Sequence, residues 1–173
     1  GGRRFVDIMF ANGGLGARPT ADGVSSLGFP ANISGAPVEV TENEKPLVFL
    51  HKELAIDSGG AGRYRGGLGQ TFSVRSTSSE KMTFAVRVDR TAHPTIGIAG
   101  GGPGALSQVC VNGAAVHPKK TLELFQGDVY SVQCAGGAGY GDPAGRDPQA
   151  LERDVADGYV SADAARRDYG RRE

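Results

Sequence analysis

Short runs of apolar and β-branched residues dominate the middle of the chain. They occupy residues 47–54, 70–77, 82–88, 106–111, 121–125 and 128–134, with partial alternation of apolar and polar positions. A period of two is typical of a strand that buries one face. The pattern therefore predicts a β-rich core over 47–142, built on a mixed or antiparallel sheet.

Turn residues separate these runs. Asn112 and Gly113 lie between QVCV and AAV, and this pair favours a type I′ hairpin, because both central positions need a positive φ. The sequence FQGD at 125–128 predicts a second tight turn.

The pattern becomes helical near the end of the chain. Asp147 can cap a helix that has Pro148 at its first position, and Ser161 can cap a second helix that stops at Gly170. We predict a helical hairpin over 143–173. Residues 1–46 follow neither period, so we predict an extended segment rich in glycine and proline. The three parts form one domain of the α+β class, β-rich, with long glycine-rich loops.

Glycine is the compositional outlier. The chain has 28 glycines, about 16 per cent of its residues against a usual value of about 7 per cent. They cluster at 13–16, 59–69, 100–104 and 136–141, whereas a flexible linker spreads its glycines evenly. These clusters indicate ordered loops.

Charge, hydropathy and cysteine content limit the kinds of partner and the compartment that we expect for this protein. The formal net charge is zero, which argues against nucleic acid and anionic membranes as partners. No membrane-spanning run or signal peptide is visible, so we expect a cytoplasmic protein. Cys110 and Cys134 each lie in a β-like run, which favours small buried side chains over a disulfide or a metal pair.

Familiar nucleotide and metal motifs are not found in the sequence. No lysine follows a glycine in the phosphate-loop pattern. The GxGxxA match at 100–105 contains Pro103 and precedes a strand-like run, where a dinucleotide site needs a helix. His51, His93 and His117 are too widely spaced for a self-contained metal site.

Arginines and carboxylates within the glycine clusters and neighbouring loops are the remaining candidates. They are Arg18, Asp22, Glu39, Asp57, Arg63, Arg65 and Asp142, together with the loop glycines Gly13, Gly14, Gly16, Gly66 and Gly67. One interpretation is that these side chains satisfy loop backbone groups and one another. The other is that glycine backbone, which has no side chains, lets a ligand or a second subunit approach closely, while an arginine guanidinium binds a carboxylate or phosphate. No catalytic residue is assigned.

Five motifs in order resemble the C-terminal part of the hydantoinase B / 5-oxoprolinase family. They are GGLGARPTADG, PANISGAPVEVTE, LAIDSGGAGRYRGGLGQ, AGGGPGA and GGAGYGDPAGRDPQALERDVADGYVSADAARRDYG. The resemblance extends over essentially the whole chain and implies about the last third of a B-type subunit, either as a fragment or as a naturally split subunit. The family's histidine and aspartate metal ligands belong to the part upstream, so no metal role transfers to these residues.

The resemblance implies membership of a hetero-oligomeric, ATP-dependent enzyme. In this family an A-type subunit is thought to phosphorylate the substrate, and the B-type subunit carries the activated species on to hydrolysis or carboxylation. We expect hydrolysis of a cyclic amide such as a hydantoin or 5-oxoproline, with Arg18, Asp22, Arg63 and Arg65 orienting the substrate or bracing the interface. A carboxylase and a non-catalytic assembly module are the alternatives. The resemblance implies ATP and a divalent metal for the whole enzyme, and we expect this chain alone to bind neither. The expected partners are the rest of the B-type subunit, an A-type subunit and a small-molecule substrate.

Overall fold

The structure is a computed structural model that describes residues 6, 8–28 and 35–170. Its elements, in chain order, are α1 (Val38–Glu44), β1 (Leu47–Leu54), β2 (Gln70–Ser76), β3 (Met82–Ala85), β4 (Gln108–Val111), β5 (Ala114–Ala115), β6 (Thr121–Leu124), β7 (Val129–Gln133), the short 3₁₀ helix η1 (Pro143–Gly145), α2 (Pro148–Ala156) and α3 (Ala162–Tyr169). Each predicted run forms a strand.

The strands form two antiparallel sheets. The larger has the order β1-β2-β7-β4-β5, and β3 pairs with β6 in the smaller one. The main apolar core joins them: Phe72 and Val74 of β2 pack with Tyr130 of β7, and Phe84 of β3 lies against the Tyr130 ring at 4.5 Å between centroids. This architecture confirms the predicted α+β class with an antiparallel sheet.

Both predicted turns are present. Asn112 and Gly113 have φ values of 50° and 78°, as a type I′ turn requires, and join β4 to β5. Gly127 has a φ of 90° in the turn between β6 and β7, where Asp128 accepts a hydrogen bond from the Phe125 N–H. Because β6 and β7 belong to different sheets, this second turn redirects the chain and does not close a hairpin.

Helix α1 is a feature that the sequence pattern did not predict. It lies inside the segment expected to be extended, and carries Glu39 in its first turn. Its sequence, VEVTENE, is rich in β-branched and polar residues, and no side chain caps its N-terminus. Other contacts support it instead: within its first turn the buried Thr41 hydroxyl donates to the Pro37 carbonyl, and Glu42 accepts from the Phe49 N–H on β1.

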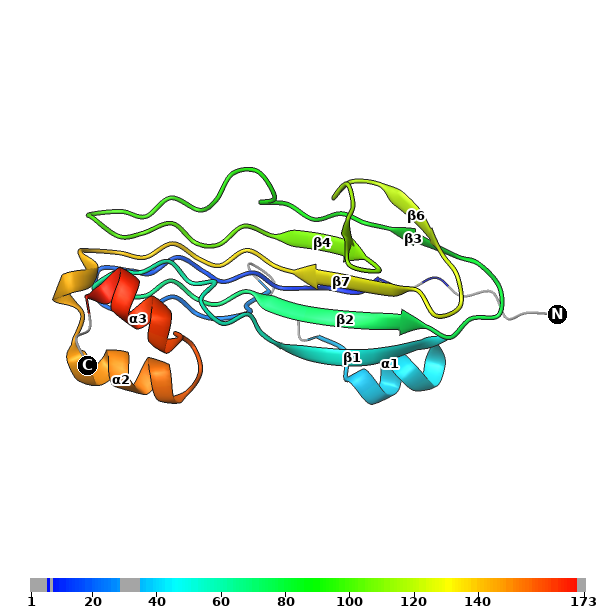
Figure 1. The fold of residues 1–173 in the computed structure, drawn as a ribbon, viewed down its shortest axis with the longest axis horizontal. Helices are drawn as coiled ribbons and strands as arrows, with labels where there is room; N and C mark the ends of the chain where they lie inside the picture. Colours follow the sequence, from blue (N-terminus) through cyan, green and yellow to red (C-terminus); the bar gives the residue numbers. More distant parts are fainter. Residues whose placement is uncertain (1–5, 7, 29–34, 171–173) are drawn as a thin grey trace.

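The glycine clusters lie in closely packed extended segments outside the helices and strands. We call these segments the glycine bundle: residues 11–18, 21–28, 57–69, 94–105 and 134–142. Figure 1 shows them as wavy strands that lie side by side between the large sheet and the C-terminal helices. Their lateral hydrogen bonds recur every third residue. Gly14 and Ala17 donate to the carbonyls of Ala135 and Ala138, and Gly23 and Ser26 to those of Arg65 and Leu68. Three residues per turn is the period of a polyproline II helix, whose peptide groups are free to bond sideways.

Close backbone contact explains the glycine content of the bundle. A Cβ added at Gly14 would lie 1.8 Å from the Gly67 carbonyl oxygen, and one added at Gly136 would lie 1.7 Å from that of Ser58. Real atoms do not approach so closely, so a side chain at either position would force the segments apart. The glycines of these segments therefore allow one part of the backbone to pack against another.

Helices α2 and α3 cover one end of the bundle (Figure 1). Asp147 accepts from the Gln149 N–H at the start of α2, and Ser161 accepts from the Ala164 N–H at the start of α3. Gly170 ends α3 in the left-handed conformation. These caps are the ones predicted from the sequence.

Candidate functional site

A cluster of four charged side chains joins the glycine bundle to the C-terminal helices. The guanidinium of Arg146 donates two parallel hydrogen bonds to Asp22, Nη1 to Oδ1 and Nη2 to Oδ2, each of 2.9 Å. Its Nη2 also donates to Asp154 Oδ2, on α2, at 2.5 Å. Asp22 belongs to the bundle, so Arg146 bridges two parts of the fold. Such a forked contact is the strongest geometry that arginine makes with a carboxylate.

Arg65 completes this cluster, which we call the charge cluster: Asp22, Arg65, Arg146 and Asp154. The Arg65 backbone N–H donates to Asp22 Oδ1 at 2.7 Å, and its Nη1 donates to the Gly66 carbonyl at 2.7 Å. Its Nε lies 3.2 Å from Asp154 Oδ2, as an ion pair without hydrogen-bond geometry. Two arginines and two aspartates leave no net charge in the cluster, which is a requirement for burying ions.

Two tyrosines cover the guanidinium groups of the charge cluster. The Arg65 guanidinium lies 5.1 Å from the centre of the Tyr159 ring, and that of Arg146 lies 6.0 Å from the Tyr169 ring. Both distances are typical of cation–π contacts. Burial raises the pKa of Tyr169 to about 12, so its hydroxyl stays neutral beside the ions.

Electrostatics favour the ionised form of Asp22. Burial alone would raise the pKa of its carboxyl group, but the hydrogen bonds and charge of Arg146, together with the N–H and charge of Arg65, outweigh burial and lower it. Arg146 shows the reciprocal effect, because the Asp22 carboxylate raises its pKa against the opposing effect of burial. The arrangement is an ion-pair clamp that stabilises the fold, and it presents no free nucleophile, acid or base.

Sequence reasoning named Asp22 and Arg65 but missed Arg146 and Asp154. The missed pair lies in the last motif, and Asp154 follows Leu151 by three residues on α2. Positions three apart share a helix face, and both side chains are buried. A carboxylate on the apolar face of a short helix was the signal that a buried cationic partner exists.

Two predicted carboxylates have local structural roles. Asp57, in the left-handed conformation with a φ of 60°, accepts a hydrogen bond from the Ser161 N–H at 2.7 Å and so attaches the start of α3 to the bundle. Asp142 caps the short helix η1 by accepting from the Ala144 N–H. Glu39 is exposed on α1, away from the charge cluster.

The remaining predicted arginines are exposed. Within the described part of the chain, the Arg18 side chain makes no hydrogen bond or ion pair; the Arg18 backbone pairs with that of Ala21. The Arg63 guanidinium lies over the neighbouring Tyr64 ring at 5.7 Å, and only its carbonyl meets the charge cluster, accepting from Arg146. The structure therefore brings Asp22 and Arg65 together and leaves Arg18 and Arg63 outside.

The predicted loop glycines divide by what surrounds them. Gly14, Gly66 and Gly67 face other backbone segments so closely that an added Cβ would lie 1.8–2.1 Å from a carbonyl oxygen, and Gly13 would meet one at 3.0 Å. Gly16 has room for a side chain, since the nearest atom to an added Cβ is 3.8 Å away, at ordinary van der Waals contact. At Gly14, Gly66 and Gly67, the space that the missing side chain leaves is therefore filled by other backbone segments of this chain and not by a ligand.

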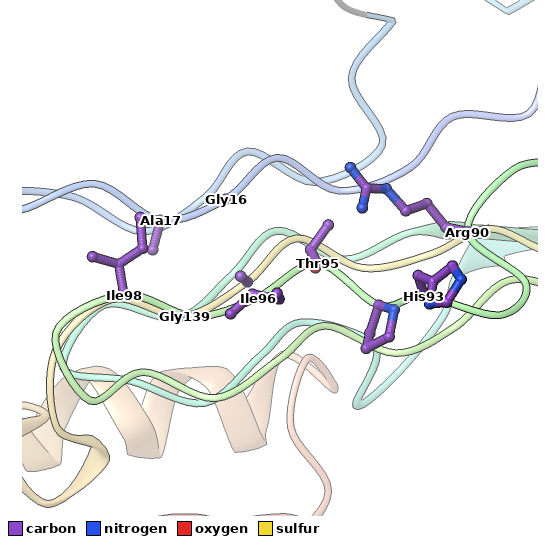
Figure 2. Close-up of a pocket in the computed structure, with 10 residues that line it drawn as sticks. Gly16, Ala17, Arg90, His93, Thr95, Ile96, Ile98 and Gly139 are labelled. Carbon is purple, nitrogen blue, oxygen red and sulfur yellow. The ribbon is translucent and has the colours of Figure 1, made fainter.

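A hollow opens on the side of the bundle where Gly16 lies. It measures about 600 Å³ and is lined by Gly16, Ala17, Arg90, His93, Pro94, Thr95, Ile96, Ile98, Ala138 and Gly139. Figure 2 shows the Arg90 side chain reaching over one end, with His93 nearby and Ile96 and Ile98 further along. We call it the Arg90 hollow. Neither Arg90 nor a role for His93 was predicted from the sequence.

The described residues offer no site for the metal implied for the whole enzyme. They contain no group of three or more His, Cys, Asp or Glu side chains placed to hold a metal ion. The two carboxylates of the charge cluster are already bound to arginines.

Among the helices of the described chain, none has the length and apolar character needed to cross a membrane.

Comparison with known proteins places the chain in a family. Its residues 1–143 match the family model for Hydantoinase B/oxoprolinase. The chain belongs to this family. It is 34% identical over 181 residues to the caprolactamase subunit beta of Pseudomonas jessenii, an alignment that includes 96% of this chain and 31% of that subunit.

Two solved structures share the fold of this chain. The ATP-dependent caprolactamase of Pseudomonas jessenii matches 92% of this chain and 29% of its own, with a TM-score of 0.77 and 30% identity. Nucleotide-free acetone carboxylase matches 92% of this chain and 26% of its own, with a TM-score of 0.71 and 25% identity. The chain thus spans about a third or less of the length of these relatives, which are subunits of multi-subunit enzymes.

Proposed function

We propose that this chain forms the C-terminal part of the B-type subunit of an ATP-dependent enzyme that hydrolyses a cyclic amide of the hydantoin or 5-oxoproline type. The observation that carries the proposal is the closer likeness to caprolactamase than to acetone carboxylase. Both identity, 30% against 25%, and TM-score, 0.77 against 0.71, favour the amide-hydrolysing relative.

The overall reaction consumes two waters and one ATP for each ring opened. The amide C–N bond breaks and a C–O bond to one water oxygen forms. The second water accounts for the release of the transferred phosphoryl group as inorganic phosphate, and ADP and phosphate leave with the ring-opened amino acid. Within this scheme the chain supplies a rigid framework: the glycine bundle fixes the backbone, and the charge cluster holds α2 and α3 against it. The proposed partners are the rest of the B-type subunit and an ATP-binding A-type subunit.

Substrate-dependent ADP release by the complete enzyme tests the proposal. We expect 5-oxoproline, hydantoin or caprolactam to stimulate ADP release with equimolar formation of the ring-opened product, and acetone or acetophenone with bicarbonate to leave it unchanged. ADP release that requires a ketone and bicarbonate, with a carboxylated product, would replace the hydrolase by a carboxylase.

Arg18 tests the alternative of a non-catalytic assembly module. Its exposed side chain is free of the fold's own hydrogen bonds within the described residues, so Arg18→Ala removes it without loosening the core. Lost turnover in an intact complex would support a substrate-orienting role, and loss of the complex itself would support the module. Asp22 is unsuitable for this test because it holds the charge cluster. Arg75→Gln, at an exposed arginine of β2, is the matched control.

A further inference from the structure

We propose that the Arg90 hollow binds a small anion that carries a carboxylate or phosphate group on a compact apolar body. The site follows from the geometry alone. The identification of its ligand with a substrate of the enzyme, or with the phosphorylated substrate, rests on the proposed function.

Arg90 is held in place without being used by the fold. Its φ of 60° is in the left-handed region, which a non-glycine residue adopts at a cost, and its carbonyl accepts a hydrogen bond from the Ser107 N–H at 2.9 Å. Within the described residues, its guanidinium makes no hydrogen bond or ion pair, while Figure 2 shows it over the hollow. Its backbone is therefore fixed at the hollow, while the exposed, unpaired guanidinium can offer two parallel N–H donors to a carboxylate or phosphate.

The polar groups around the hollow favour an anion. Arg90 supplies a positive charge, His93 supplies an imidazole that can donate a hydrogen bond, and none of the lining residues is acidic. Both also line an adjoining hollow with Asp89 and Lys119. The Asp89 carboxylate is 2.5 Å from the Lys119 ammonium, so it is neutralised by its own partner and does not compete for Arg90. An oxyanion placed between Arg90 and His93 therefore meets an attractive field.

The other end of the hollow is apolar. Ile96 is 83% exposed and Ile98 is 66% exposed. The backbone of Ile98 is fixed, because its N–H donates to the Gly139 carbonyl and its carbonyl accepts from the N–H groups of Gly101 and Gly141. Covering large, exposed apolar side chains with a ligand removes apolar surface from water, which favours binding. With Ala17 and Pro94 they form a wall for a small ring or alkyl body.

Direct binding to the complete enzyme, without ATP, tests the site. The probes are 5-oxoproline for a carboxylate, phenyl phosphate for a phosphate and 2-pyrrolidone as the uncharged ring, each titrated by calorimetry. We expect at least one anionic probe to bind, and Arg90→Asn to weaken it about tenfold or more, as the loss of a charge-assisted hydrogen bond does. Asparagine tolerates the left-handed backbone, so this variant keeps the local conformation.

Two further variants separate the site from general effects. Ala17→Phe adds a ring beside the apolar wall and should weaken the same probe while every charge stays in place. Arg75→Gln removes an exposed arginine of β2 outside the hollow and should leave binding unchanged. Preference for one anionic probe over the other identifies the source of the oxyanion.

The proposal is overturned if neither anion binds, if Arg90→Asn binds both anions as the natural enzyme does, or if 2-pyrrolidone binds as tightly as the anion that binds better. Because the titration needs no turnover, its outcome is independent of the activity assay. Binding that depends on Arg90 in an enzyme that hydrolyses no cyclic amide would reject the proposed function and retain the site.

Discussion

At the scale of single residues, burial decides which charged side chains serve the fold. Arg65, Arg146 and Asp154 are 4–7% exposed, and removing ions from water is costly unless each meets an opposite charge. Asp22 supplies the second carboxylate, so the four charges balance. Arg90 differs because its guanidinium remains in water, where it is available to a ligand at little desolvation cost.

Cys134 should resist alkylation in the folded protein. Burial raises the pKa of its thiol to about 11, and only 7% of the residue is exposed. At pH 8 roughly one thiol in a thousand is then ionised, and the thiolate is the reactive form. Mass spectrometry after brief iodoacetamide treatment should find Cys110, which is partly exposed, modified before Cys134. In urea both should react, and a Cys134 that reacts equally fast with and without urea would contradict its burial.

Acid should weaken the charge cluster through Asp22. The pKa of Asp22 in the folded chain is below its ordinary value of 3.8, so the unfolded chain binds the proton more tightly and stability rises with pH through this range. The contribution is complete above the unfolded pKa and is lost as pH falls through the folded one. Urea unfolding between about pH 2 and pH 6 should show that the free energy of unfolding falls less on acidification in Asp22→Asn than in the natural chain. Glu152→Gln, an exposed change on α2, should retain the natural slope.

At the scale of elements, the glycine bundle replaces regular secondary structure with lateral bonding of extended segments. Backbone hydrogen bonds that a sheet would place at every second residue recur here at every third. The segments approach one another so closely that side chains are excluded from the contact, which a sheet never requires. The bundle is therefore sensitive to single methyl groups.

Gly14 and Gly16 test this sensitivity within one segment. In Gly14→Ala the new Cβ would lie 1.8 Å from a backbone oxygen, whereas in Gly16→Ala its nearest neighbour is 3.8 Å away. We expect Gly14→Ala to lower the free energy of unfolding by about 1–3 kcal/mol or more. Gly16→Ala should change it by about 0.5 kcal/mol or less. Urea denaturation measures both, and equal midpoints would show that the bundle relaxes around the added methyl group.

The sequence predicted those elements whose period or caps are local. Alternation located the strands, and Asp147 and Ser161 located α2 and α3. The bundle was missed because its period of three matches neither strand nor helix, and α1 because β-branched residues without a cap do not indicate a helix. Asp22 could be named as a site residue, but its partner Arg146 is 124 positions away. The folded chain alone brings such a pair together.

At the scale of the whole molecule, polar contacts between described residues attach the C-terminal helices to the bundle at two places. One is the charge cluster, and the other is Asp57, whose carboxylate accepts from the Ser161 N–H and whose own N–H donates to the Tyr159 carbonyl. The helices also have a small apolar core of their own, formed by Leu151, Val160 and the alanines of α3. Their docking thus depends on polar contacts more than on a shared apolar core with the sheets.

Removing one cation from the charge cluster should release this docking. In Arg146→Gln, Asp22 and Asp154 face Arg65 alone, and breaking a buried ion pair in this way costs about 3–5 kcal/mol. The loss should be local: hydrogen exchange should accelerate at the amides of α2 and α3, while those of β2 and β7 keep their protection. Arg153→Gln removes an exposed arginine from the same helix and should leave the exchange unchanged. If Arg146→Gln protected α2 and α3 as well as the natural chain does, Asp57 and the small apolar core would be sufficient to hold the helices, and the charge cluster would lose its role as the clamp.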